Sequence, residues 1–274
     1  NCAALGRLND FDEYADAARA AIDSGEFDDV GDAFSCVVAA GYSTTGRPER
    51  AVEWCRTSIA RRPDGHTASE AVMVVSLAVC GAAAEAMAVS ENLLAAAAAA
   101  DNPSLAGAAL LGYGWARRES DPTAAYEALR RALVIADESG DRQQTSIIAG
   151  LLAGLAADRG ELAEAFGYIA QTVRHYYDSG TTELMRVTVG LLAALLVRLG
   201  IHEPATTIMG FTTAAIGYPS FPEISGAIAH LRDVLGEERY QSLAMTGSTM
   251  TTTEIADYAF EQIDLARTTL ADQT

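Results

Sequence analysis

The ten residues GELAEAFGYI (160–169) contain the feature that decides the fold, a glycine followed at once by a helix-forming segment. Glycine readily adopts the left-handed backbone conformation that ends a helix, and the glutamates and alanines favour the start of the next one. The chain is therefore expected to repeat one unit, made of a helix, a tight turn and a second helix. Similar segments recur at GRPERAVEWC (46–55), GAAAEAMAVS (81–90), SDPTAAYEAL (120–129) and GIHEPATTIM (200–209).

The register of the repeat follows from the residue five positions after each turn. With Asn9 and Ser120 taken as turn residues beside the four glycines, successive positions are 37, 35, 39, 40 and 40 residues apart. A helical hairpin of this size cannot bury its own apolar face, so neighbouring hairpins stack on one another. The sequence thus predicts an all-α protein, an α-solenoid of about six hairpins. The register positions are Tyr14, Ala51, Ala86, Ala125, Ala165 and Ala205.

Composition excludes several kinds of chemistry. The chain has 274 residues, 50% of them hydrophobic, and a formal net charge of −18. All 19 basic residues are arginine, which excludes a phosphate-binding loop ending in lysine and a Schiff-base lysine within this chain. Phosphate backbones repel so acidic a chain, so we expect no direct binding of nucleic acid. No apolar run reaches the length of about 18 residues that suggests a membrane span, and we expect none.

Neither a metal site nor a catalytic site is expected. The four cysteines show no CxxC spacing, and the four histidines show no HExxH spacing. Buried thiols in a reducing cytoplasm are the simpler interpretation of the cysteines. Nothing in the sequence assembles a nucleophile, a base and an oxyanion donor, so we expect a protein that is not an enzyme and has no cofactor.

The repeat resembles the tetratricopeptide repeats, in the longer and looser form found in bacterial regulators. The strongest matches are LLAGLAADRGELAEAFGYIAQTV (151–173) and LLGYGWARRESDPTAAYEALRRALVIADESGD (110–141). The spacings exceed the usual tetratricopeptide length of about 34 residues, which implies longer helices or loops. The resemblance covers residues 1–216 and implies a right-handed superhelix, with residues 217–274 as C-terminal capping helices of the same superhelix.

The tail is similar to one family in particular. A loop punctuated by Pro219 and Pro222 precedes ISGAIAHLRDVLGEERYQSLAMTGSTMTTTEIADYAFEQIDLA (224–266). This pattern resembles the end of the helical-repeat region of large actinobacterial LuxR-type and cyclase-ATPase (STAND-like) transcriptional regulators. The resemblance implies a cytoplasmic module that binds a protein segment or a small inducer and controls NTPase and DNA-binding domains and self-association. Because the chain starts at Asn1 inside an expected helix, we expect it to be part of a longer protein.

A second interpretation stays open, a generic protein-interaction scaffold without a small-molecule ligand. In either case the first helix of each hairpin would line a concave surface, which includes Arg117. Arg117 and Arg118 at the end of one first helix, with Arg130 and Arg131 in the middle of the second helix of the same hairpin, are candidate anion contacts. Ion pairs with nearby carboxylates explain the same arginines equally simply. The other concave positions are small or aliphatic, which fits either tight packing or a floor for an apolar helix or ligand. They are Gly107, Leu110, Gly114, Ile147, Gly150, Gly154, Ala157, Val187, Gly190, Ala194 and Val197.

The last segment, TTTEIADYAFEQIDLART (251–268), is expected to form a capping helix. Thr251 followed by Glu254 makes a capping box, so the helix should start there. Its apolar face should dock on the last hairpin near Ile208 to Phe211, because a solenoid must cover the face of its final unit. The alternative is a free dimerisation face. The residues expected on the apolar face are Ile255, Tyr258, Ala259, Gln262, Ile263 and Ala266.

Overall fold

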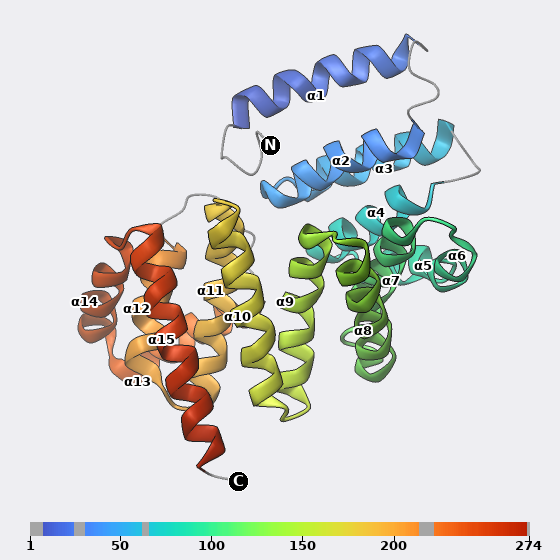
Figure 1. The fold of residues 1–274 in the computed structure, drawn as a ribbon. Helices are drawn as coiled ribbons and strands as arrows, with labels where there is room; N and C mark the ends of the chain where they lie inside the picture. The colour runs from blue at the N-terminus through green and yellow to red at the C-terminus, as the bar shows by residue number, and fades with distance from the viewer. Residues whose placement is uncertain (1–7, 25–30, 62–65, 214–221, 273–274) are drawn as a thin grey trace. The chain divides into compact units, whose positions relative to one another are not determined.

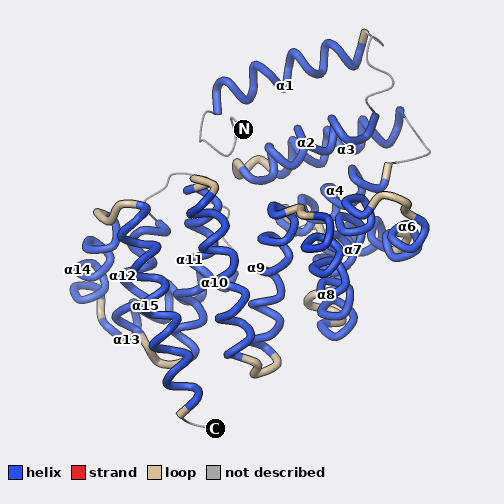
Figure 2. Tube along the Cα trace, viewed as in Figure 1, coloured by secondary structure: helices blue, strands red, loops and turns tan. Residues whose placement is uncertain are grey.

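The computed structural model describes residues 8–24, 31–61, 66–213 and 222–272, and every regular element in these ranges is a helix (Figures 1 and 2). The prediction of an all-α protein is therefore confirmed. The chain divides into two compact units, residues 1–148 and 149–274, and the division lies within one long helix. The predicted domain boundary at residue 216 lies outside the described residues. No described helix is long and apolar enough to cross a membrane.

The first unit contains eight complete helices in its described part, and α9 (Arg142–Asp158) begins in it and ends in the second unit. The helices are α1 (Leu8–Asp23), α2 (Gly31–Thr44), α3 (Pro48–Arg61), α4 (Thr67–Val79), α5 (Ala83–Ser90), α6 (Leu93–Ala99), α7 (Pro103–Arg117) and α8 (Pro122–Ser139). Neighbours in sequence pack on one another, as in the pairs α2–α3, α3–α4 and α7–α8. Helix α7 also packs on α4, α5 and α6.

The second unit contains the C-terminal half of the fold. Its helices after α9 are α10 (Leu162–Asp178), α11 (Thr182–Arg198), α12 (His202–Thr213), α13 (Pro222–Leu235), α14 (Glu237–Ser248) and α15 (Thr252–Ala271). Helices α10, α11 and α12 pack in sequence, while α13 packs on α11 and α14 packs on α12. Helix α15 packs chiefly on α10 and also contacts α11 and α12.

The predicted glycine turns are confirmed at Gly46, Gly81, Gly160 and Gly200, which all have positive φ angles between 73° and 81°. At Gly160 the N–H of Glu161 donates to the carbonyl of Ala156, and the N–H of Gly160 donates to that of Ala157. This pair of bonds satisfies the last free carbonyls of the helix and needs the left-handed residue that glycine supplies.

Two further left-handed glycines show how the repeat is built. Gly140 and Gly180 end α8 and α10 with φ angles of 72° and 68°. Together with Gly160 and Gly200 they place a left-handed turn every twenty residues through this part of the chain. The forty-residue spacing read from the sequence is therefore two successive helix-and-turn steps of equal length.

The alanine register positions are also confirmed. Ala51, Ala125, Ala165 and Ala205 are fully buried, and Ala86 is 1% exposed. An alanine at this point allows the second helix of a hairpin to approach its neighbours closely. Five of the six register positions are therefore core positions, as the spacing indicated.

The N-terminal end of the register is wrong. Asn9 lies inside α1 and not at a turn, and Tyr14 is 65% exposed. The expected helix at Asn1 lies outside the described residues. Helix α1 follows a different pattern, in which Ala15 and Ala18 face the protein and Tyr14 faces solvent. Asparagine can also end a helix in the left-handed conformation, but the chain continues as a helix through Asn9, so residue type and spacing together did not suffice to place a turn there.

Candidate functional site

The predicted concave positions of α7 are covered by neighbouring helices. A Cβ atom on Gly107 would lie 2.7 Å from Oε1 of Gln144, and one on Gly114 would lie 2.6 Å from Cγ of Leu129. Leu110 is 1% exposed. These three positions are packing contacts with α8 and the first turn of α9, so they do not line an open surface.

The equivalent positions of α9 are more open. Ile147, Gly150 and Gly154 are half-buried, and a Cβ atom added to either glycine would meet no atom within 4 Å. Ala157, the last predicted position on this helix, is buried at 7% exposure. The α9 face therefore has room for larger side chains at its two glycines, which α7 lacks.

Helix α11 combines both situations. Gly190 is buried, and a Cβ atom there would lie 2.8 Å from Cδ1 of Ile224 and 2.9 Å from Cγ2 of Thr212. Val187 and Ala194 are half-buried, as is Val197. Gly190 thus serves the packing of α11 against α12 and α13, while the other positions keep part of their surface accessible.

Arg117 and Arg118, at the end of α7, each lie against an aromatic ring of that helix. The guanidinium carbon of Arg117 is 5.4 Å from the ring centroid of Tyr113, and that of Arg118 is 5.0 Å from Trp115. Arg118 also forms a weak ion pair with Glu119 at 3.7 Å, whereas the buried Nε of Arg117 has no hydrogen-bond partner. Cation–π contact therefore accounts for part of the placement of both side chains.

The other two arginines of this cluster lie on α8. Arg130 is 5.9 Å from the ring centroid of Tyr126, one helical turn before it, and Arg131 is exposed. Arg130 therefore repeats the pattern of the α7 arginines, in which the cation covers an aromatic ring of its own helix. The stacking accounts for Arg117, Arg118 and Arg130 without a bound anion and leaves the predicted anion contact untested.

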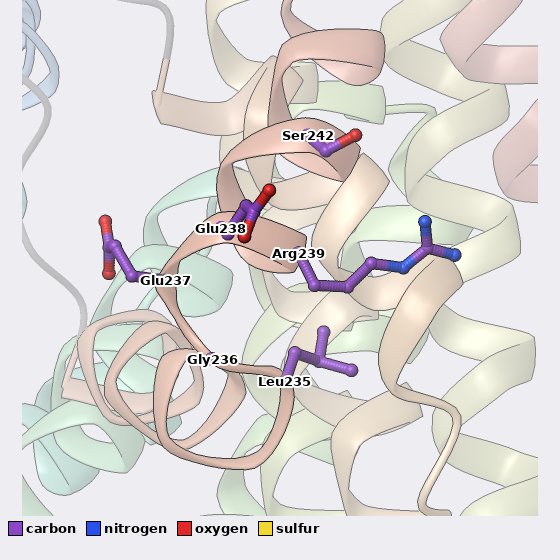
Figure 3. Close-up of a pocket in the computed structure, with 6 residues that line it drawn as sticks. All are labelled: Leu235, Gly236, Glu237, Glu238, Arg239 and Ser242. Carbon is purple, nitrogen blue, oxygen red and sulfur yellow. The ribbon is translucent and has the colours of Figure 1, made fainter.

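A shallow hollow of about 480 Å³ lies where α13 meets α14. Leu235, Gly236, Glu237, Glu238, Arg239 and Ser242 line it (Figure 3). The side chains of Glu237 and Arg239 point in opposite directions, so they do not converge on one ligand atom. Arg239 binds Glu203 at 2.8 Å and Arg232 lies 3.6 Å from Glu237, so two of the charged side chains of the hollow already have partners of opposite charge. In the described part of the chain no three His, Cys, Asp or Glu side chains gather as metal ligands would.

The C-terminal helix docks as expected, but its principal partner differs. The capping box of Thr251 and Glu254 is present, and Ile255, Ala259 and Ile263 are at most 1% exposed. Tyr258 is half-buried, and burial raises the pKa of its phenol, partly offset by a hydrogen bond with Thr207 of α12.

The contacts with α10 place α15 beside an earlier helix than the sequence predicted. The guanidinium of Arg174 lies 5.0 Å from the ring of Phe260, and the hydroxyls of Tyr177 and Thr253 are 3.4 Å apart. Helix α12, which contains Ile208 to Phe211, packs more extensively on α14 than on α15. The prediction of the docking position was therefore wrong in part, because another helix had already covered the α12 surface.

The contact between α12 and α14 was missed altogether. A Cβ atom on Gly210 would collide with the backbone of Ala244, and one on Gly247 would collide with the backbone of Thr207. The two helices therefore touch backbone to backbone at these glycines. A glycine inside a helical pattern was the available signal, since it usually has a packing reason.

The sequence matches no family model and no curated protein.

Proposed function

We propose that the chain is a non-catalytic, tetratricopeptide-like sensor and assembly module of a multidomain transcriptional regulator. In this proposal it forms a right-handed superhelix of about six hairpins in the cytoplasm and binds a protein segment or a small inducer. Occupancy would control NTPase and DNA-binding domains encoded outside this chain. The resemblance of the repeats and of the tail to LuxR-type and cyclase-ATPase regulators supports this assignment.

The observations that carry the interaction role are a half-buried strip on α9 and, separately, half-buried positions on α11. Ile147, Gly150 and Gly154 on α9, and Val187 and Ala194 on α11, are small or aliphatic and keep part of their surface accessible. Partly exposed apolar surface with glycines that admit close approach suits an apolar helix or ligand. Regular stacking of helix-and-turn units is the architecture that supplies extended surfaces of this kind.

The test of this assignment is to read the coding sequence that lies upstream and downstream of this chain in its gene. A lysine-bearing phosphate loop upstream and a helix-turn-helix downstream would support the regulator assignment. Stop codons or unrelated modules on both sides would refute it and favour the generic interaction scaffold.

A binding test separates the surface from the fold. Gly154→Arg and Gly226→Arg both place a long side chain where a Cβ meets no atom within 4 Å, so neither should disturb packing. The upstream and downstream polypeptides serve as probes in calorimetric titrations of the chain. Binding lost in Gly154→Arg and kept in Gly226→Arg supports the strip, and binding kept in both excludes it.

A further inference from the structure

Within the first unit, helix α1 is held against the residues of α2 and α3 mainly by charged and aromatic contacts. Among its described side chains the buried apolar residues are Ala15 and Ala18, which have little surface to bury. Tyr14 is 65% exposed and faces away from the attachment. Short apolar side chains of this size stabilise a docked helix only weakly. Phe11 and Ile22 are half-buried and add apolar contact, and the polar contacts along the helix contribute the rest of what holds it.

The first of these contacts is a compact cluster near the start of α1. Arg47 Nη1 donates hydrogen bonds to both carboxylate oxygens of Asp12, each at 2.6 Å. The ring of Phe11 meets the edge of Tyr42 at 4.9 Å between centroids, and it occupies space that a Cβ on Gly41 would need. Gly41 on α2 thus leaves a notch for the ring of Phe11. Arg47, close by in sequence, holds the carboxylate of Asp12.

Two more contacts continue along the helix. The guanidinium carbon of Arg19 lies 3.8 Å from the ring centroid of Trp54, which is 5% exposed. At the end of the helix Asp23 forms an ion pair with Arg61. The attachment therefore extends the length of α1, with an acid at each end and a cation over an aromatic ring between them.

Charge explains why this helix lies on this surface. Helix α1 carries five carboxylates and one arginine. The segment that receives it, residues 47–61, carries four arginines and two glutamates. In a chain of net charge −18 this segment is a local basic strip, and an acidic helix is its complement.

We propose that the face formed by α2 and α3 is a docking surface for an acidic amphipathic helix of a protein partner, and that α1 is its resident competitor. The partner helix carries an aromatic residue followed by a carboxylate, for the notch at Gly41 and for Arg47, and a second carboxylate about a helix length later for Arg61. Exposed ion pairs contribute little each, so α1 can leave when such a helix competes. A separate helix of this length is marginal in water, so the partner segment folds as it binds.

The test uses the full chain and a labelled synthetic peptide of residues 8–24 as the probe, with binding measured by fluorescence anisotropy. Asp12→Asn weakens the resident helix but leaves the surface intact, so the peptide should bind this variant about fivefold more tightly than the unchanged chain. The double variant Asp12→Asn with Arg47→Gln removes the arginine that the peptide needs, so the gain should disappear.

Three further measurements control the result. Asp158→Asn removes an ion pair with Arg198 inside the second unit, away from the contacts of α1 within the first, and should leave the peptide affinity unchanged. Melting temperatures confirm that each variant is folded. Equal peptide affinity in the unchanged chain and Asp12→Asn, or a gain that survives Arg47→Gln, would overturn the proposal. A doubled mass in light scattering that Arg47→Gln abolishes would overturn the assignment to a partner and indicate exchange of α1 between copies.

Discussion

Substitution of alanine for Gly210 or Gly247 should destabilise the second unit, although alanine favours helices. A methyl group at Gly210 would enter the backbone of Ala244, and one at Gly247 would enter the backbone of Thr207. Backbone atoms cannot rotate aside as a side chain can, so α14 must move away from α12. Overpacking of this kind typically costs about 1–3 kcal/mol, and the rigid obstacle places both sites near the upper end.

The propensity gain opposes this cost without cancelling it. Alanine is favoured over glycine by about 1 kcal/mol inside a helix. With an overpacking cost of about 3 kcal/mol, each substitution should lower the free energy of unfolding by about 2 kcal/mol. Gly167 and Gly226 are matched controls, because a Cβ atom on either meets no atom within 4 Å. There the propensity gain acts alone and alanine should stabilise the protein by up to about 1 kcal/mol.

The assay is thermal unfolding followed by circular dichroism, with guanidinium unfolding as an independent measure. At about 2–4 °C per kcal/mol, the contact and control variants should differ by about 6–12 °C in melting temperature. The direction of the change in melting temperature decides the test. If Gly210→Ala raises the melting temperature as Gly167→Ala does, α12 and α14 are not in backbone contact and the reasoning fails.

Three more predictions concern α15 and Tyr176 of α10. Ile255→Asp places an unpaired charge at a fully buried position and should cost at least about 4 kcal/mol, whereas Leu265→Asp on the 54% exposed side of the same helix should be nearly neutral in denaturant unfolding. Hydrogen bonds from the backbone and side chain of Thr251 lower the pKa of Glu254 below 4.5, so its stabilisation is present above that pH and lost as the pH falls through the folded pKa. The stability difference between the unchanged chain and Glu254→Gln should therefore vanish in strong acid, and a difference that persists there would contradict the capping role. Burial raises the pKa of Tyr176 well above 10.0, so the folded state should lose stability as the pH rises above 10, and Tyr176→Phe should reduce that loss in alkaline unfolding curves.

The turns and the alanine register could be predicted because both depend on local properties. A left-handed backbone conformation favours glycine wherever it occurs, so the turns at Gly160 and Gly200 can be predicted without knowing which helices pack around them. The buried alanines follow from the spacing to those turns. Asn9 shows the limit of the argument, since residue type and spacing together placed a turn inside α1.

The partners of each face could not be predicted in the same way. Periodicity identified the buried face of α15 through Ile255, Ala259 and Ile263, and these residues are buried. It could not identify α10 as the principal surface they meet, because many apolar faces satisfy the same pattern. The contact of Asp12 with Arg47, 35 residues away, likewise has no sequence signal beyond opposite charge.

Glycine has three distinct physical roles in this chain, and the sequence separates only one of them, the left-handed turn, from the other two. Gly160 supplies a left-handed turn, Gly210 admits the backbone of another helix, and Gly154 leaves open space beside α9. Glycines of the second and third kind both stand inside a helical pattern in the sequence. Substitution by alanine should nevertheless destabilise the protein at the second kind and stabilise it at the third. An open glycine in a helix gives up stability that alanine would restore. At Gly150 and Gly154 a Cβ atom meets no atom within 4 Å, so alanine should stabilise the protein there as it should at Gly167 and Gly226.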